Sequence, residues 1–119
     1  MGEIKRFEDL EVWREARTIV QYVYRATSDS DYKRDFSLRD QVRRAAVSMM
    51  ANIAEGFSRR SNRELAQYLF IAKASAAEVQ SHLYVALDQG YVNQEQFQRL
   101  YDRTDRYARQ VSALITYLL

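Results

Sequence analysis

The sequence predicts an all-α fold: an up-down-up-down antiparallel four-helix bundle in which residues 1–119 form one domain. Proline is absent and glycine occurs three times, so little in the composition interrupts long helices. Apolar residues recur at spacings of three and four in four segments, about 8–27, 38–57, 62–89 and 94–118. The connections between these segments are short, which makes consecutive helices antiparallel neighbours.

The composition also narrows the possible chemistry and location. Cysteine is absent, which excludes disulfides, thiolate nucleophiles and cysteine metal sites. The charged N-terminal stretch MGEIKRFEDLEVW lacks the apolar core of a signal peptide, and no run approaches the ~18 apolar residues of a membrane span. We therefore expect a cytoplasmic protein that makes no membrane contact.

Polar residues mark the ends of the first two predicted helices. Residues 8–27 begin with acidic side chains and end near Arg25, as the helix dipole prefers. The polar segment 28–36 is the longest predicted loop and the part expected to be most mobile. Ser37, with Asp40 three residues later, forms a capping-box arrangement that predicts the start of the second helix.

The second and third predicted helices form a hairpin with a turn of only a few residues. Gly56 either ends the second helix as a C-terminal cap or lies inside it at a close helix contact. Ser61 is expected to cap the third helix, with Glu64 at the third position of the box. Gly90 ends that helix and Asn93 caps the fourth one.

Both helices of this hairpin are more apolar than one bundle core requires. The middle of the second helix is an uncharged run, residues 45–54, and the third helix carries only Lys73 and Glu78 as charges from Leu65 to Leu87. Apolar faces that one core cannot cover must pair with another subunit. We therefore expect an obligate homo-oligomer.

No catalytic or metal-binding constellation stands out in the sequence. His82 is the single histidine, and no cysteine accompanies it, so a nucleophilic triad has no basis. Glu78 precedes His82 by four residues, whereas di-iron bundles use Glu-x-x-His on two helices. A glycine-rich phosphate loop is also missing. We expect no enzyme activity, no metal and no cofactor.

Two polar residues near the uncharged run, Asn52 and Glu55, are predicted to be buried and structural. Asn52 is expected to form a hydrogen bond across a helix contact. Glu55 is expected to pair with an arginine such as Arg43 or Arg44, across the hairpin or a subunit contact. Glu78 lies in a similarly uncharged stretch, and a functional role for the two glutamates is the alternative.

Arginine supplies most of the positive charge, with fifteen Arg and three Lys among the 18 basic residues, although the net charge is only +2. The hairpin turn carries a compact basic tip formed by Arg59, Arg60 and Arg63. These arginines are either charges that only contact water or residues that bind phosphate, and both interpretations fit the sequence. A second candidate group lies at the start of the second helix, roughly 24 Å away at ~1.5 Å per residue. It consists of Arg39, Arg43 and Arg44.

Five short motifs, read in order, resemble the bacterial four-helix bundle proteins encoded in intervening sequences of 23S rRNA genes. They are F-E-D-L-E-V-W (7–13), Q-V-R-R-A-A-V-S (41–48), N-I-A-E-G (52–56), A-x-x-S-x-A-E (72–78) and L-D-x-G-Y (87–91). The resemblance implies a small bundle that assembles into pentameric rings. It also implies structural similarity to the accessory variability proteins of diversity-generating retroelements, which bind reverse transcriptase and nucleic acid.

The resemblance marks Asn52, Glu55, Gly56 and Glu78 as structural motif residues. The sequence departs from the family before Asn52, because Met49-Met50-Ala51 stands where members carry proline and serine, which predicts a straighter second helix.

Two functional hypotheses follow. The first is a non-enzymatic homo-oligomeric binding module whose ring displays arginines to RNA or DNA, with a partner enzyme such as a reverse transcriptase. The second is an oligomeric protein-interaction scaffold with no nucleic-acid role, in which the arginines form salt bridges between subunits.

Overall fold

The computed structural model describes residues 4–119, except for the side chain of Ser30, and in this part the chain forms helices and no strand. The all-α prediction is confirmed. The elements are η1 (Phe7–Asp9), α1 (Glu11–Thr27), η2 (Ser30–Arg34), α2 (Phe36–Ser58), α3 (Asn62–Asp88) and α4 (Gln94–Leu118), where η denotes a short 3-10 helix.

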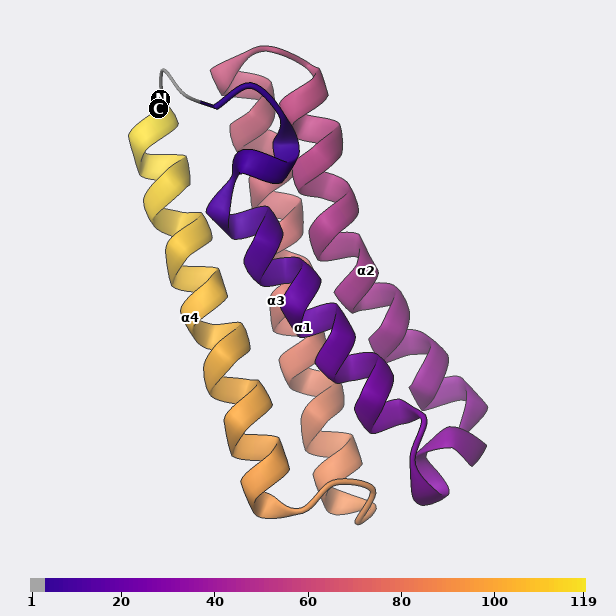
Figure 1. Cartoon of the computed structure of the whole chain (residues 1–119). Coiled ribbons are helices and arrows are strands. Elements are labelled where there is room, and N and C mark those ends of the chain that lie inside the picture. The colour runs from indigo at the N-terminus through magenta and orange to yellow at the C-terminus, as the bar shows by residue number, and fades with distance from the viewer. Residues whose placement is uncertain (1–3) are drawn as a thin grey trace.

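The four α-helices pack side by side as an elongated bundle measuring 45 × 21 × 20 Å (Figure 1). The α2–α3 turn lies at the end of the bundle that also holds η1 and the C-terminus, and the α1–α2 and α3–α4 connections lie at the opposite end (Figure 1). Each helix contacts two neighbours, and α1 and α4 close the bundle. The α1–α4 pair therefore lies on the side opposite the α2–α3 hairpin.

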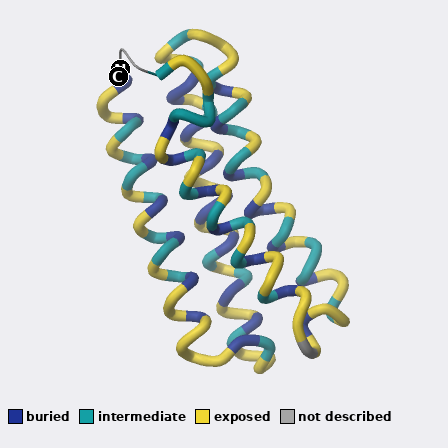
Figure 2. Tube along the Cα trace, in the orientation of Figure 1, coloured by how far each residue is buried: buried dark blue, intermediate teal, exposed yellow. Residues whose placement is uncertain are grey.

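A single hydrophobic core runs along the bundle axis, and Figure 2 shows the buried positions on the inward side of each helix. The spacing of three and four that predicted the helices also selects the buried residues. The largest fully buried side chains are Tyr32, Tyr107, Ile19, Met49, Ile53, Leu69, Leu83, Val23, Val42, Val79 and Val111, with Thr27 beside them. None of the described helices is both long enough and apolar enough to cross a bilayer.

The first helix begins later than predicted. Residues 7–9 form the separate helix η1, and the backbone at Leu10 is extended, with φ −75° and ψ 126°. Leu10 is buried in the core, and Phe7 packs edge-on against Trp13 with ring centres 5.1 Å apart. The acidic residues predicted a helix from residue 8 onward. The chain instead turns at Leu10, whose side chain is buried, and α1 starts at Glu11.

The segment 28–36 is more ordered than the predicted polar loop, because it contains η2 and a core residue. Tyr32 is 1% exposed and stacks on Tyr91, with ring centres 5.2 Å apart. The Tyr91 hydroxyl donates a hydrogen bond to the Asp35 carboxylate at 2.9 Å. These contacts tie the α1–α2 connection to the α3–α4 connection at one end of the bundle.

The predicted cap of the second helix is wrong. Asp35, not Ser37, caps α2, because its Oδ1 accepts a hydrogen bond from the Leu38 backbone N–H at 3.1 Å. The Ser37 hydroxyl instead accepts a bond from Gln41. Burial of Tyr32 places Asp35 at the helix start, and the helix then runs without interruption from Phe36 to Ser58, through the Met49-Met50-Ala51 stretch.

The hairpin turn resolves the alternatives for Gly56. Gly56 lies inside α2 and is buried, and a Cβ atom added to it would lie 2.6 Å from the Tyr68 Cβ. The close contact between α2 and α3 therefore requires a residue without a side chain. Arg60 makes the turn in the left-handed conformation, with φ 57°. Ser61 caps α3 as predicted by accepting a bond from the Glu64 N–H at 3.3 Å.

The predicted end of the third helix is confirmed. Gly90 has φ 77°, its N–H bonds to the Leu87 carbonyl, and the Tyr91 N–H bonds to the Ala86 carbonyl at 2.9 Å. Asn93 then caps α4 in a complete capping box with Gln96, with both hydrogen bonds at 2.8 Å.

Candidate nucleic-acid and self-association surfaces

The first candidate surface is the basic tip at the α2–α3 turn. Arg59 donates a hydrogen bond from Nη2 to the Tyr68 hydroxyl at 2.7 Å, and its guanidinium lies 5.4 Å from the ring centre. Arg60 and Arg63 are exposed, and neither has a hydrogen-bond or ion-pair partner within residues 4–119. Two guanidinium groups at this tip therefore keep all their donors available to a ligand, and a third is oriented by a tyrosine.

The tertiary structure adds Lys5 to this group. Lys5 and Arg60 both line an open hollow of about 580 Å³, whose apolar walls include Phe57 and Leu65. No sequence signal connects Lys5 with the hairpin turn, because the N-terminal segment reaches the turn only through folding. We call the set Lys5, Arg59, Arg60 and Arg63 the basic end.

Arg43, from the second candidate group, is held inside the chain. Its Nε donates to the Thr27 hydroxyl at 2.7 Å, and its Nη2 donates to the Ser28 hydroxyl at 3.1 Å. The guanidinium also lies 4.5 Å from the centre of the Tyr24 ring. These contacts fasten α2 to the C-terminal end of α1, so Arg43 contributes to the fold and has few donors left for phosphate.

Arg39 is held in a similar way. It forms an ion pair with Asp40 at 2.9 Å, donates to the Lys33 carbonyl at 3.1 Å, and lies over the Phe36 ring at 4.8 Å. Of this group, only Arg44 is exposed without a partner in the described chain. The six predicted arginines thus divide between opposite ends of α2, and the structure does not bring them together.

Asn52 and two serines form a short polar chain between α2 and α3. The Asn52 side-chain amide donates to the carbonyl and the hydroxyl of Ser48, at 2.9 Å each. The Ser48 hydroxyl lies 2.9 Å from the Ser75 hydroxyl of α3. Asn52 is half-buried and reaches the neighbouring helix through Ser48, whereas the sequence predicted a direct bond.

The prediction that Glu55 is buried is wrong for the single chain. Glu55 lies on the outward side of α2, its carboxylate contacts Ser58 at 3.5 Å, and no arginine of the described chain pairs with it. Glu78 is also exposed, with its carboxylate 3.5 Å from Nε2 of the half-buried His82. No three potential metal ligands among the described residues lie close enough to hold an ion.

The second candidate surface is the outward side of the α2–α3 hairpin. Phe70 and Ile71 are 54% and 48% exposed, and Val47 and Val85 are also exposed. The hydrogen bond between the Ser48 and Ser75 hydroxyls joins the two helices beneath this side, one residue after Val47 on α2 and one turn after Ile71 on α3. We call the outward set Val47, Ala51, Phe70, Ile71, Ala74, Ala77 and Val85 the outer face.

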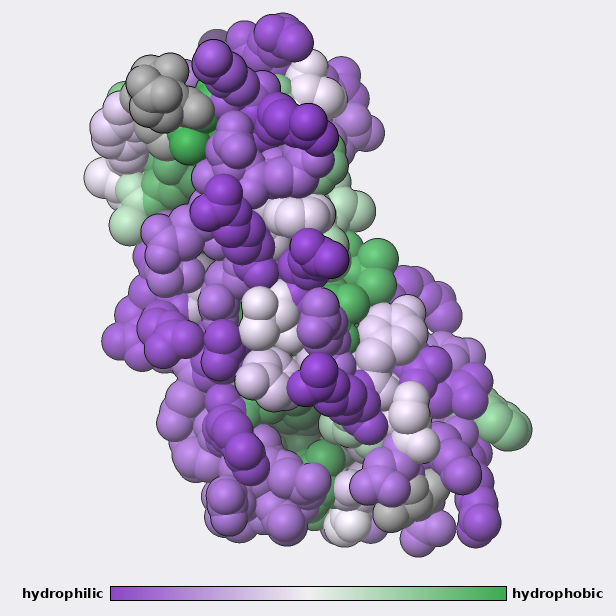
Figure 3. Space-filling model, viewed as in Figure 1, coloured by the Kyte–Doolittle hydropathy of each residue, from purple (hydrophilic) through white to green (hydrophobic). Residues whose placement is uncertain are grey.

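The surface in front of α1 has a different character. Figure 3 shows this face of the molecule as largely hydrophilic, with hydrophobic residues in small separate areas. On the outer face, seven apolar side chains are exposed beside a few charged residues such as Arg44, Glu55 and Glu78. The outer face is therefore the candidate surface for a protein contact.

Comparison with known proteins places the chain among small bundle proteins. A family model described as 23S rRNA-intervening sequence protein matches residues 8–113. A crystal structure from Bacteroides thetaiotaomicron VPI-5482, described as a protein with unknown function from the S23 ribosomal protein family, is similar in fold. Its TM-score is 0.78 at 20% identity, covering 87% of this chain and 97% of that one. No curated protein matches the chain. The match over most of the bundle shows that the chain belongs to the 23S rRNA-intervening sequence protein family.

Proposed function

We propose that this protein is a non-enzymatic, self-associating module that binds nucleic-acid phosphates through its basic end. The observation that carries the proposal is the pair of unpartnered guanidinium groups on Arg60 and Arg63, beside the oriented Arg59 and the nearby Lys5. Phosphate contacts need N–H donors that the protein does not use itself. Contacts of this kind position a protein on a nucleic acid and carry little sequence preference.

Self-association through the outer face supports this function. One chain supplies only a few positive charges, so a monomer is expected to bind weakly. Packing of the outer face against the next copy buries exposed Phe70 and Ile71. The family resemblance favours a ring of five copies, in which each interface joins two different surfaces. A ring with all basic ends at one rim raises avidity by ~10² to 10⁴ when the nucleic acid reaches several of them at once.

The test is a titration of labelled single-stranded and duplex RNA and DNA at low and at physiological salt. The variant is Arg60→Glu with Arg63→Glu, which leaves the Arg59 contact with Tyr68 intact. We expect the parent protein to bind at low salt with affinity that falls steeply as salt rises, and the variant to lose binding while its assembly is unchanged.

The matched control reverses two arginines outside the basic end, Arg34→Glu with Arg109→Glu, whose side chains are 76% and 77% exposed. It makes the same change in net charge and is expected to retain most of the binding. Equal loss in both double variants would show that net charge alone controls binding. No binding by the parent at low salt would refute the nucleic-acid function.

Self-association has its own test. Light scattering at micromolar concentration is expected to give a mass several times the 14.1 kDa of one chain. Phe70→Glu with Ile71→Glu is expected to give monomers, because each change places a charge in the outer face. A monomeric parent protein would refute the assembly.

The alternative is an oligomeric scaffold without a nucleic-acid role. It is supported by Arg39 and Arg43, whose guanidinium groups form contacts within the chain, and by Arg44 and Glu55, which are exposed on the same helix and available for salt bridges between copies. A scaffold is expected to assemble as above and to bind no nucleic acid at any salt concentration. In either case a partner enzyme such as a reverse transcriptase rests on the family resemblance alone.

A further inference from the structure

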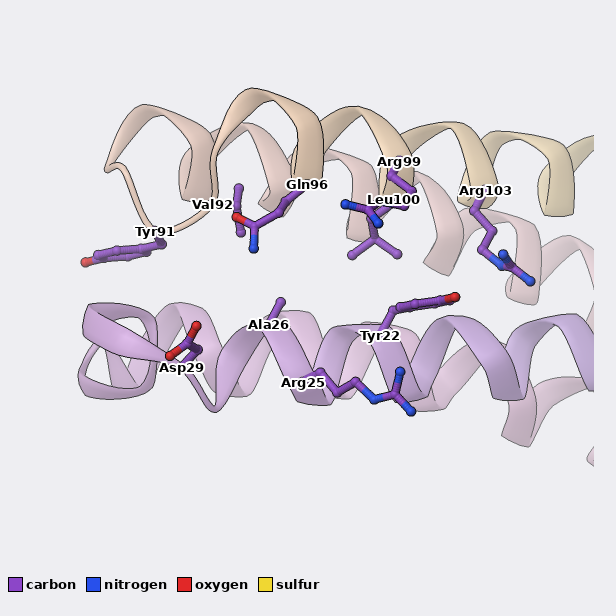
Figure 4. A pocket seen from close by; sticks show the side chains of 10 residues that line it. All are labelled: Tyr22, Arg25, Ala26, Asp29, Tyr91, Val92, Gln96, Arg99, Leu100 and Arg103. Atoms are coloured by element: carbon purple, nitrogen blue, oxygen red, sulfur yellow. The ribbon is translucent and has the colours of Figure 1, made fainter.

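A small pocket opens between α1 and α4, near the end of the bundle that holds the α3–α4 connection (Figure 4). Its volume is about 300 Å³, at the lower end of the range for small-molecule sites. Tyr22 and Ala26 point into it from α1, and Leu100 points into it from α4 (Figure 4). We call it the α1–α4 pocket.

The floor of the pocket is apolar and its size depends on one small residue. Ala26 faces α4 between the side chains of Val92 and Leu100 (Figure 4), and both of these are buried. A larger side chain at position 26 would fill this space. Tyr22 closes one end of the pocket, where the Arg103 guanidinium lies 5.2 Å from its ring centre, and Tyr91 lies at the other end (Figure 4).

The rim of the pocket is rich in guanidinium groups. Arg25 comes from α1, while Arg99 and Arg103 come from α4, and Asp29 is the acidic residue among the lining side chains. Arg103 lies 2.8 Å from the Glu15 carboxylate, which neutralises it. Arg99 points into the gap between the two helices, whereas the Arg25 guanidinium lies beneath Tyr22 on the side away from α4 (Figure 4). Arg99 is therefore the cation best placed to meet a ligand.

Neither of these two arginines is committed to a strong contact. Arg25 lies over the Tyr22 ring at 5.8 Å. Arg99 is 3.5 Å from Glu95, but both side chains are mostly exposed, and exposed pairs of this kind contribute little. The amide of Gln96 lies on the same rim and offers further hydrogen-bond donors.

We propose that the α1–α4 pocket binds a small organic oxyanion, with its phosphate or carboxylate group at Arg99 and Gln96 and its apolar body on Ala26 and Leu100. Guanidinium groups match the geometry of both oxyanions, and the apolar floor favours a ligand that carries more than the anion alone. The site lies on the side opposite the outer face and away from the basic end. One chain supplies all of its lining residues, so its formation requires neither the proposed assembly nor nucleic-acid binding.

The test uses phenyl phosphate and benzoate as probes. Inorganic phosphate, which carries only the anion, and phenol, which carries the ring without the anion, serve as controls. Saturation-transfer NMR on the full chain detects binding of the aromatic probes and of phenol directly. Inorganic phosphate has no C–H protons, so its binding is measured by competition with phenyl phosphate. We expect phenyl phosphate, benzoate or both to bind. Phenol is expected to bind more weakly by about tenfold or more, because it lacks the charge-assisted contact. Inorganic phosphate is expected to bind more weakly because it lacks the apolar body. Whichever of the two probes binds more tightly identifies the oxyanion.

Two variants locate the site. Ala26→Leu fills the floor without changing any charge and is expected to abolish binding of both probes. Arg99→Gln is expected to weaken binding by about tenfold. Arg109→Gln is the matched control, because Arg109 lies on the same helix in a similar exposed pair with Asp105, outside the pocket. It is expected to leave binding unchanged.

Three results would overturn the proposal: no saturation transfer to either probe at millimolar concentration, binding that survives Ala26→Leu, or equal loss in the Arg99 and Arg109 variants. Thermal melting of each variant in the absence of probe checks that the fold is retained. If Ala26→Leu does not fold, Ala26→Val takes its place, with reduced probe affinity as the expected result.

Discussion

Substitution of Gly56 by alanine tests the close contact between α2 and α3. A Cβ at this position would lie 2.6 Å from the Tyr68 Cβ, and 3.1 and 3.3 Å from two Leu65 atoms. The Tyr68 Cβ is fixed to its backbone, so a side-chain rotation cannot relieve the clash and the helices must separate. Overpacking of this kind costs about 3 kcal/mol, while alanine gains about 1 kcal/mol in helix propensity over glycine. We expect Gly56→Ala to lower the free energy of unfolding by about 2 kcal/mol.

The assay is urea denaturation followed by circular dichroism, at one protein concentration because assembly contributes to stability. Ala113→Gly, at an exposed position inside α4, measures the propensity term by itself and is expected to cost about 1 kcal/mol. If Gly56→Ala were as stable as the parent protein, or about 1 kcal/mol more stable, the clash would not exist and the reasoning about the close helix contact would be refuted.

Three further predictions concern single side chains. Arg43→Gln should lower the free energy of unfolding by about 1–2 kcal/mol, because it breaks the contacts between α1 and α2. Its exposed neighbour provides the control, since Arg44→Gln should change this free energy by less than about 0.5 kcal/mol. Equal effects of the two substitutions in chemical denaturation would contradict the prediction. Asn52→Ala should lower the free energy of unfolding by about 1 kcal/mol, because the side chain loses its hydrogen bonds to Ser48 on the same helix. Glu55→Ala should leave this free energy nearly unchanged when it is introduced into the Phe70→Glu/Ile71→Glu variant. A large loss of stability in that variant would show that Glu55 has an unrecognised partner. Burial raises the pKa of Tyr32 from 10.0 to about 12, so the folded state keeps a proton that the unfolded chain releases; stability should be level below pH 10 and fall as the pH rises from about 10 to 12. Tyr32→Phe should change stability at pH 7 by less than about 0.5 kcal/mol, because the buried hydroxyl has no hydrogen-bond partner among the described residues, and should reduce the alkaline loss in pH-dependent melting.

The fold was predictable because its signals are local. Helix periodicity depends on contacts three and four residues apart, and the Asn93 cap and the Gly90 stop act within a single turn. Ser61 likewise caps α3 from the neighbouring position in sequence. The misassigned cap at Ser37 shows the limit, since Asp35 was selected by burial of Tyr32 and by a bond from Tyr91, far away in the chain.

The candidate surfaces were less predictable. Both Asn52 and Glu55 lie in or beside an uncharged run that indicated burial, but the direction of each side chain depends on where α3 packs against α2. Asn52 faces the hairpin contact and Glu55 faces outward. Arg43 and Arg44 are adjacent in sequence, yet one is bonded to α1 and the other is exposed. Sequence spacing alone does not distinguish them, because it shows which residues share a helix face and not which neighbour covers that face.

The sequence by itself determined four amphipathic helices, their order, most of their ends and an excess of apolar surface on the central hairpin. Only the tertiary structure decided that Lys5 joins the arginines of the hairpin turn, and that Arg25 and Arg99 line the same pocket. The physical reason is that helix formation and capping are contacts within a few residues, whereas a charged surface or a pocket is assembled from segments whose proximity arises only when the core packs.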